Sequence, residues 1–528
     1  MTAVVAVAAS FGVLDVLSHG VTVPSFAPEL AALVGLGVGI DYALFVVTRY
    51  RAALRAGSAP RDAVVAAVAT SGRAVLFAGS TVVLSLLGLF LLGLPFIYGA
   101  ALGAIIAVLL VMAASVTLLP AALGFVGPGI DRLRVGRRRP DGGSDQSSVT
   151  QRGFWWSWSR RVQRRPLLTG GAAVAVLMLL AVPFFSLRLA FTDAGTEPSG
   201  YTSRQAYDLL AKGFGPGASG PLVVALSLPG GAGRSAVATL RADLARQPDV
   251  ALVSPPRYSP AGTAAVLTVI PRTSPQDART SALVKHLRDT VVPQATARSP
   301  VRVLIGGQTA ASIDTAGVIS ARLAVVVAFV ILLSVLLLMM AFRSVVVPVV
   351  SALLTLLSTG AAYGVIVAVF QWGWLGGGID NGATAPVDPW IPLMLFALLF
   401  GFSMDYQVFL ISRIREEWRT GLADSDAVAA GLAKTGRIIT SAAAIMICVF
   451  AAFVLGDLRV LRVIGLGMAV AVLLDATLVR MVATPAVLQL VGRANWWFPR
   501  RLERAVPGIL GEVDPQQPPP MAAASRAQ

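Results

Sequence analysis

The chain has 528 residues, of which 56% are hydrophobic and 13% are charged, whereas soluble domains carry roughly 25% charged residues. This composition excludes an ordinary soluble protein and indicates helices that cross a membrane. The formal net charge of +16 comes mainly from arginines near the ends of apolar segments, without an aromatic-basic binding module. It therefore follows the positive-inside pattern of membrane proteins and argues against nucleic acid as a partner.

Ten apolar runs are long enough to be membrane spans, so we expect a multi-pass protein of the cell membrane. In chain order they cover residues 1–17, 28–48, 73–93, 95–126, 167–188, 320–341, 344–370, 389–412, 437–456 and 459–491. The fold class is thus an α-helical polytopic membrane protein with one additional domain outside the membrane. The single cysteine and two histidines predict neither a disulfide framework nor a metal site.

The arginine-rich stretch after the fourth run sets the expected orientation. Residues 127–165 form a polar, basic linker that we place, loosely held, in the cytoplasm, with an interfacial part around its tryptophans. Both chain ends are then cytoplasmic. The expected divisions are a first transmembrane repeat (1–126), the linker (127–165), a transmembrane helix (166–188), an extracytoplasmic domain (189–318), a second transmembrane repeat (319–491) and a cytoplasmic tail (492–528).

The extracytoplasmic segment has the pattern of a small α+β domain. Short runs rich in β-branched residues alternate with two amphipathic helical patterns in the order β-α-β-β-α-β. The strands are expected at 221–229, 250–255, 263–271 and 301–307, and the helices at 235–247 and 277–291. This order predicts a split βαβ, or ferredoxin-like, fold.

An internal repeat is the most informative feature of the sequence. GVGIDYALFVVTRYR (37–51) aligns without a gap with GFSMDYQVFLISRIR (401–415), an offset of 364 residues. The same offset places Gly72 and Arg73 on Gly436 and Arg437. Residues 28–126 and 389–491 are therefore two copies of one unit, and duplicated membrane units are typical of transporters.

Each copy carries an Asp-Tyr pair inside a membrane span. An aspartate at that depth costs about 2.5–3.5 kcal/mol, so it normally faces a partner or a cavity. Neither aspartate has a positive charge beside it at its own depth, and such burial suits a carboxyl that gains and loses a proton. Neighbouring residues on a helix point to different faces. If the two copies pack face to face, Asp41 therefore meets Tyr406 and Asp405 meets Tyr42, with Gly35, Gly37, Gly39 and Gly401 allowing close approach.

Other residues are weaker candidates for support of this relay. Phe45 and Phe409 lie one turn beyond the aspartates and could exclude water on one side. Asp475 is a third intramembrane acid, for which a structural pairing with Arg480 or a neighbouring helix is an equal alternative. Thr440 and Ser441 could supply hydroxyls. Asp41 and Asp405 also have an alternative interpretation, in which they only hold two helices together through buried hydrogen bonds.

Four motifs carry a resemblance to a known family: GLGVGIDYALFVVTRYR, FGFSMDYQVFLISRIREEW, AGLAKTGRIITSAAAIMICVFAAFVLGD and IGLGMAVAVLLDATLVRMVATPAVL. In these the chain resembles the mycobacterial membrane protein large (MmpL) family of the resistance–nodulation–division superfamily. The resemblance implies export of lipids or lipid-like metabolites, driven by the proton gradient and without a cofactor. It also implies a proton relay of Asp41, Tyr42, Asp405 and Tyr406, a porter-like extracytoplasmic domain, and membrane lipids and a lipidic substrate as partners.

The chain also departs from the family pattern, which has twelve spans and two porter domains. The first span, first porter domain and second span have no counterpart here. Either the reading frame begins further upstream, or this is a split or decaying copy, or another subunit or copy supplies the missing parts. A truncated, non-transporting membrane scaffold and a protein-export accessory are alternative functions. The cytoplasmic segments show no nucleophile–base set or phosphate loop, so we do not expect an enzyme.

Overall fold

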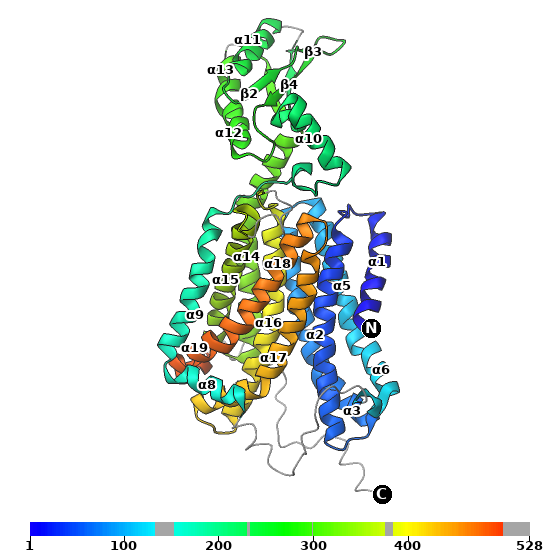
Figure 1. Ribbon diagram of the computed structural model, residues 1–528, viewed down its shortest axis with the longest axis vertical. Helices are drawn as coiled ribbons and strands as arrows, with labels where there is room; N and C mark the ends of the chain where they lie inside the picture. The colour runs from blue at the N-terminus through cyan, green and yellow to red at the C-terminus, as the bar shows by residue number, and fades with distance from the viewer. Residues whose placement is uncertain (132–152, 230–232, 298, 375–383, 500–528) are drawn as a thin grey trace.

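A bundle of long helices carries a small α+β domain at one end (Figure 1). The computed structural model describes residues 1–131, 153–229, 233–297, 299–374 and 384–499. The hydrophobic core of the bundle is continuous through both copies of the repeat. The α+β domain has a separate core of its own.

Nine helical segments of the described residues are long and apolar enough to span a membrane. The first repeat contributes α2 (Ala27–Arg55), α3 to η2 (Pro60–Leu92) and α5 to α6 (Pro95–Val126). These are followed by α9 to η4 (Pro166–Ser186). The second repeat contributes α14 (Gln308–Phe342), α15 to η9 (Val346–Gln371), α16 (Trp390–Arg419), α17 (Asp424–Val454) and α18 to η11 (Arg459–Trp496).

The expected first span is a shorter helix, α1 (Thr2–Ser18). Its 17 residues rise about 26 Å, slightly less than a hydrocarbon core of about 30 Å. It packs against α2 and α5. Nine of the ten expected spans therefore have full spanning length, and the first does not.

Several spans contain local changes of helix type. The second is made of α3 (Pro60–Ala67), the π-helical η1 (Val68–Gly72), α4 (Arg73–Leu87) and the 3-10 helix η2 (Gly88–Leu92). The helix α3 is thus continuous with the span that follows it. The last span is made of α18 (Arg459–Leu474), the π-helical η10 (Asp475–Ala483), α19 (Thr484–Val491) and η11 (Gly492–Trp496). Such π-helical turns are rare and frequently occur at functional sites.

The remaining spans subdivide in the same way. In the first repeat, α5 (Pro95–Val116) is followed by α6 (Leu118–Val126) and η3 (Gly127–Asp131). The next span is α9 (Pro166–Ala181) with η4 (Val182–Ser186), and α15 (Val346–Ile366) continues into η9 (Val367–Gln371). Proline at the first or second position begins α3, α5 and α9, where its missing N–H removes no helical hydrogen bond.

The sheet of the extracytoplasmic domain has the expected ferredoxin-like topology. Strands β1 (Leu222–Ser227), β2 (Val250–Val253), β4 (Ala264–Pro271) and β5 (Arg302–Gly306) lie in the order β2-β4-β1-β5, with antiparallel neighbours. A short β3 (Arg257–Tyr258), not expected, pairs with β4. The helices of this unit are α11 (Arg234–Ala245), α12 (Ala278–His286), η8 (Leu287–Val291) and α13 (Val292–Thr296).

Three further elements join the domain to the bundle. A 3-10 turn η5 (Ala194–Thr196), the helix α10 (Thr202–Phe214) and η6 (Pro216–Ser219) precede β1. After β5, α14 runs from the domain into the bundle without interruption, so the boundary expected at 318/319 lies inside one helix. The strand-like segments at Leu189 and Val387 form a parallel bridge that ties the domain's entry to the loop before α16.

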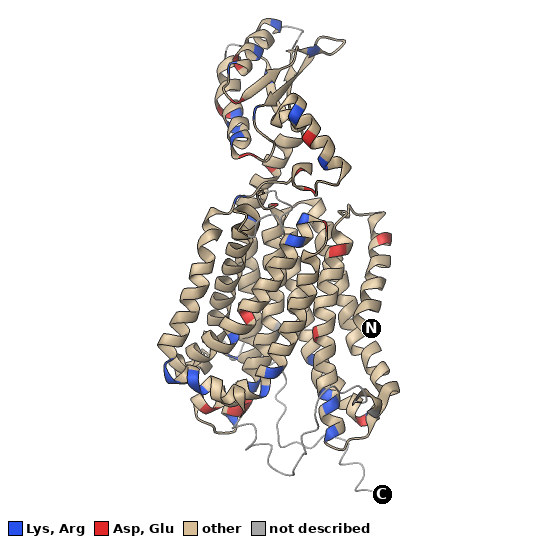
Figure 2. Cartoon of the chain, in the orientation of Figure 1, with Lys and Arg blue, Asp and Glu red and all other residues tan. Residues whose placement is uncertain are grey.

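The arginine-rich linker contains more structure than expected. Residues 153–164 were predicted as part of a loosely held segment, but α8 (Phe154–Arg164) is a helix packed on α17 and α19. The prediction was wrong there because Trp155 and Trp158 bury against the bundle core, which a composition-based argument does not register. Basic residues gather at this end of the bundle, opposite the α+β domain (Figure 2). Residues 132–152 and the part of the expected tail after residue 499 lie outside the described residues.

Candidate functional site

The two Asp-Tyr pairs lie in α2 and α16, inside the helical bundle. Asp41 and Tyr42 are 5% and 0% exposed, and Tyr406 is 4% exposed. Asp405 precedes Tyr406 in α16, but its side chain lies outside the described residues. Of the two crossed pairings that we expect, the structure therefore tests the one between Asp41 and Tyr406.

The carboxyl of Asp41 lies within hydrogen-bonding reach of the Tyr406 hydroxyl, which agrees with the expected crossed pairing. The same hydroxyl also lies 2.9 Å from the sulfur of Met446 in α17. A phenol has one hydrogen to donate, so donation to Asp41 and donation to Met446 exclude each other. Asp41 Oδ1 is buried and has no hydrogen-bond partner in the described part of the chain.

A buried arginine from another helix completes the centre. Arg480, in η10, is 0% exposed. Its guanidinium carbon lies 4.9 Å from the centroid of the Tyr406 ring and close enough to act electrostatically on Asp41. From the sequence we expect Arg480 only as a partner of Asp475, because its closeness to Tyr406 and Asp41 cannot be read from positions along the chain. An arginine within an otherwise apolar span is itself a signal of function.

Asp475 holds this arginine in place. Arg480 Nε and Nη2 donate to Asp475 Oδ2 at 2.8 and 2.6 Å. Arg480 Nη2 also donates to the backbone carbonyl of Ser403, in α16. The structural pairing considered for Asp475 is therefore present, and it aims the guanidinium at the ring of Tyr406.

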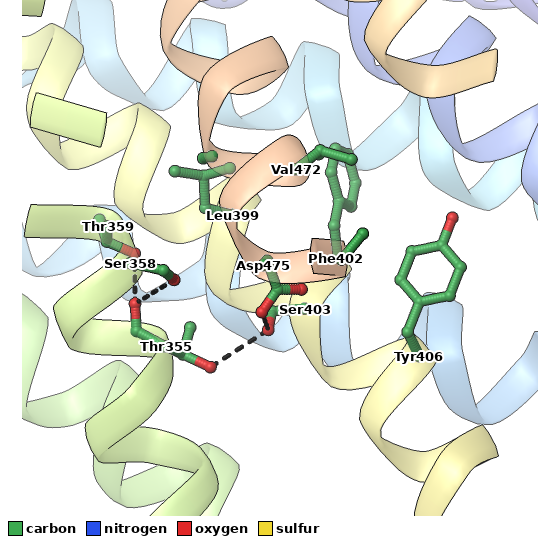
Figure 3. A pocket seen from close by; sticks show the side chains of 11 residues that line it. Thr355, Ser358, Thr359, Leu399, Phe402, Ser403, Tyr406, Val472 and Asp475 are labelled. Atoms are coloured by element: carbon green, nitrogen blue, oxygen red, sulfur yellow. Dashed lines mark hydrogen bonds between the residues drawn. The ribbon is translucent and has the colours of Figure 1, made fainter. Parts of the chain in front are cut away.

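A chain of hydroxyl groups extends from this ion pair into α15. The Ser403 hydroxyl donates to Asp475 Oδ1 at 3.1 Å and lies 3.1 Å from the hydroxyl of Thr355. Thr359 and Ser358 in turn donate to the Thr355 carbonyl at 2.8 and 3.0 Å. Figure 3 shows these groups on one side of α16 and Tyr406 on the other. They line a cavity of about 20 Å³, enough for about one water molecule.

Aromatic rings occupy the space between α2 and α16. Phe45 packs edge-on against Phe409, with ring centroids 5.2 Å apart, and lies 6.4 Å from the Tyr406 ring. Beside them, toward the end away from the α+β domain, is a cavity of about 720 Å³ lined also by Tyr42 and Arg73. Both phenylalanines line this cavity, and Phe45 lies beside the Tyr406 ring; their role as a barrier to water stays a prediction.

Two of the four glycines lie where the copies of the repeat meet. A Cβ on Gly37 of α2 would meet Phe450 of α17, and one on Gly401 of α16 would meet α4, so both lie at close contacts between the copies, as expected. A Cβ on Gly35 or Gly39 would instead meet α1 and α5. The prediction was wrong for these two, because they face helices of their own half.

The two remaining candidates are not brought to the centre. The Thr440 hydroxyl donates to the carbonyls of Gly436 and Arg437 in its own helix. Ser441 is exposed on the surface of α17. Since many threonines in helices make such local bonds, neither residue contributes a hydroxyl to the Asp41–Tyr406 contact.

Comparison with known proteins establishes the family. The family model described as "MMPL family" matches residues 1–169 and 200–513. The chain belongs to the MMPL family. It is therefore a multi-pass membrane protein of the resistance–nodulation–division superfamily.

Curated MMPL relatives align along nearly the whole chain. "Heme uptake protein MmpL11" of Mycobacterium tuberculosis is 37% identical over 513 residues, which cover 96% of this chain and 52% of the relative. "Mycolic acid-containing lipids exporter MmpL11" of Mycolicibacterium smegmatis is 36% identical over 97% of this chain and 53% of the relative. "Membrane protein YdfJ" of Bacillus subtilis is 33% identical over 96% of this chain and 68% of the relative. The chain thus spans about half the length of the mycobacterial relatives it matches.

Among solved structures, the MMPL chain resembles SecDF, a translocon-associated membrane protein from Thermus. The TM-score is 0.52 at 16% identity, and the match covers 93% of this chain and 58% of the SecDF chain. At this identity the likeness concerns the fold alone.

Proposed function

We propose that this protein exports lipids or lipid-like metabolites across the membrane and that proton movement through the bundle drives the export. The observation that carries the proposal is the buried cluster in which Asp41, Tyr406 and Arg480 from three helices meet. The names of two relatives support the substrate class: "Mycolic acid-containing lipids exporter MmpL11" and "Trehalose monomycolate exporter MmpL3", both from Mycolicibacterium smegmatis.

The charges of the cluster suit a group that takes up and releases a proton. Arg480 is the buried cation, and Asp475 already binds it through two hydrogen bonds. The charges of Arg480 and Asp475 cancel each other. Ionised Asp41 therefore adds a negative charge that nothing balances, in a site shielded from water. In such a site an uncompensated charge is costly. Neutralising Asp41 with a proton removes this cost, and the nearby guanidinium keeps the ionised form attainable.

Tyr406 links the protonation state of Asp41 to the contacts that α16 makes with neighbouring helices. When Asp41 is ionised, its carboxylate is the stronger acceptor for the Tyr406 hydroxyl. When Asp41 is protonated, the hydroxyl is free to donate to Met446, which lies 2.9 Å away in α17. Proton uptake would thus change a contact between α16 and its neighbours, which is the kind of discrete rearrangement that transport cycles need.

The repeat supports a transport cycle in which the two halves move against each other. Asp41 belongs to the first copy, whereas Tyr406, Arg480 and Asp475 belong to the second. The contact that responds to protonation therefore lies between the copies. By position, Asp405 and Tyr42 form the reciprocal pair of the relay, as the resemblance implies.

Reconstitution of the full chain into liposomes with an internal pH-sensitive dye tests the proposal. Proton flux and release of a fluorescent lipid to acceptor vesicles are measured together. We expect Asp41→Asn and Asp405→Asn to lower proton flux by on the order of a hundredfold, the scale of positioned proton-transfer groups. Asp15→Asn, at an exposed aspartate of α1, is the matched control. Flux equal to that of the unsubstituted protein in both relay variants would exclude the proposal.

A further inference from the structure

The helix α8 has two different faces. Trp155, Trp158, Ser159 and Val162 point toward the bundle, where Ser159 and Val162 are fully buried. The opposite face exposes Phe154, Ser157, Arg161 and Arg164. A helix with one basic, exposed face beside apolar side chains is suited to lie in the headgroup layer of a membrane.

The inner face is fixed by specific contacts. Trp158 Nε1 donates to the Met481 carbonyl of η10 at 3.0 Å, and Gln163 Nε2 donates to the Ser425 carbonyl at 3.1 Å. The Trp155 ring packs so closely on Gly436 that a Cβ there would lie 2.7 Å from it. These contacts prevent α8 from turning its arginines toward the protein.

One arginine of α8 is neutralised and the others are not. Arg160 forms an ion pair with Asp426 at the start of α17. The side chains of Arg161, Arg164 and the following Arg165 are exposed, and none of their guanidinium groups makes a hydrogen bond or ion pair with any residue in the described ranges. Three positive charges therefore face the surroundings at one corner of the bundle.

A lipid-facing apolar surface begins directly beside these charges. The helix α9 starts at Pro166, and only 11% of its most apolar stretch is buried inside the protein. Leu167 and Leu168, next to Arg165, are 74% and 65% exposed, and Leu179 further along is 71% exposed. Figure 1 shows α9 rising along the edge of the bundle from α8, and Figure 2 shows basic residues where the two helices meet.

We propose that an acidic phospholipid binds at this corner, in the leaflet that faces away from the α+β domain. Its phosphate lies against Arg161, Arg164 and Arg165, and its acyl chains lie along α9. The combination of unneutralised arginines with a contiguous apolar strip matches both parts of such a molecule. A soluble anion would use only the arginines, and a zwitterionic phospholipid would bring a compensating positive charge.

Native mass spectrometry of the full chain, released from micelles that contain phosphatidylglycerol or phosphatidylcholine, tests this site. We expect one phosphatidylglycerol to bind more tightly than phosphatidylcholine. Each arginine near a charged membrane surface is worth about fivefold in affinity. The triple variant Arg161→Gln/Arg164→Gln/Arg165→Gln should therefore weaken phosphatidylglycerol binding by at least about tenfold and leave phosphatidylcholine binding unchanged.

Two further variants and one competitor complete the experiment. The control Arg234→Gln/Arg241→Gln/Arg246→Gln removes equal charge from α11 and its C-terminal end, in the α+β domain, and should bind as the unsubstituted chain does. Replacement of the three corner arginines by lysine should retain most of the affinity, which separates charge loss from misfolding. Glycerol phosphate, the soluble headgroup, should not displace the lipid. Unchanged phosphatidylglycerol binding in the glutamine variant, equal binding of both lipids, or displacement by glycerol phosphate would each overturn the proposal.

Discussion

The guanidinium of Arg480 lies 4.9 Å from the centre of the Tyr406 ring. This contact joins two features that are 74 residues apart in the chain (480 − 406 = 74), an ion pair in the last span and the Asp-Tyr motif of the second repeat. A cation over an aromatic face is attracted by the ring, more strongly when both are shielded from water. The contact therefore places a positive charge beside the close approach of Asp41 and Tyr406.

Removing this cation should destabilise the protein as well as stop proton movement. In Arg480→Met, the carboxylate of Asp475 remains buried without its partner, which typically costs about 3–5 kcal/mol. The double variant Arg480→Met/Asp475→Leu should recover most of the lost stability, because it removes both charges, but it should not recover proton flux. Thermal unfolding in detergent and dye-based flux measure the two effects separately. An Arg480→Met protein that unfolds at the temperature of the unsubstituted chain would contradict this account of the ion pair.

The hydroxyl of Tyr406 and its ring should have separable roles. Tyr406→Phe keeps the ring under Arg480 but removes the donor to Asp41, so we expect proton flux to fall by on the order of a hundredfold while stability falls by only about 1 kcal/mol. Tyr363→Phe is the matched control, because the buried Tyr363 hydroxyl donates to the Pro392 carbonyl at 2.5 Å, away from the relay. If both variants lose flux equally, the effect belongs to helix packing and not to the relay.

Phe45 should act as a barrier. Its ring packs on Phe409, lies 6.4 Å from the Tyr406 ring and lines the cavity of about 720 Å³. We expect Phe45→Ala to raise proton leak in the absence of lipid substrate and to reduce lipid export less than Asp41→Asn does. Loss of the aromatic pair itself should cost about 1 kcal/mol. Phe77→Ala removes a ring that lines the same cavity from α4, and it should leave the leak unchanged.

The junction between the α+β domain and the bundle should weaken as pH rises. Burial raises the pKa of Asp388 above its ordinary value, and hydrogen bonds from Thr192 and the charge of Arg459 offset this only in part. Burial likewise raises the pKa of Asp193. A carboxyl whose pKa is raised by folding binds its proton more tightly in the folded state. The stability that such a carboxyl gives to the folded protein is complete below its ordinary pKa of about 3.9. It is lost as the pH rises through the pKa of the carboxyl in the folded protein.

Thermal unfolding at pH 4 to pH 8 measures this dependence. Asp388→Asn keeps an acceptor for Thr192 N, which donates to Asp388 Oδ1 at 3.1 Å, but it has no proton to lose. We therefore expect the midpoint temperature of the variant to fall less with rising pH than that of the unsubstituted chain. Asp249→Asn, in the loop between α11 and β2, should retain the full dependence. If the midpoint temperatures of Asp388→Asn and of the unsubstituted chain fall equally with rising pH, the pH dependence does not come from Asp388.

Much of the architecture follows from the sequence because it depends on local patterns. Apolar runs of spanning length predict the long helices, and alternating strands and amphipathic helices predict the ferredoxin-like sheet, including its order of elements. The 364-residue offset identifies Asp41 and Tyr406 as members of equivalent motifs. Their contact then follows from one assumption, that the two copies pack together in the membrane.

Other parts of the site could not be predicted because they depend on distant side chains. Ser403 and Thr355 are small hydroxyl residues in apolar helices, and such residues usually bond to their own helix. Only the packing of α15 and α16 brings the two hydroxyls to 3.1 Å. The glycine spacing of α2 is compatible with any close helix neighbour, and the structure places Gly37 against α17 of the other copy but Gly35 and Gly39 against α1.

The sequence by itself determined the membrane class, the duplicated unit and the acids that lie at bilayer depth, because hydropathy and repetition are properties of the chain. Tertiary structure alone decided which groups compensate the charge of those acids. Arg480 reaches Tyr406 and Asp41 because η10 packs beside α16 and Asp475 holds the guanidinium there. An electrostatic interaction depends on distance in space and on shielding from water, and neither is encoded in the separation of residues along the chain.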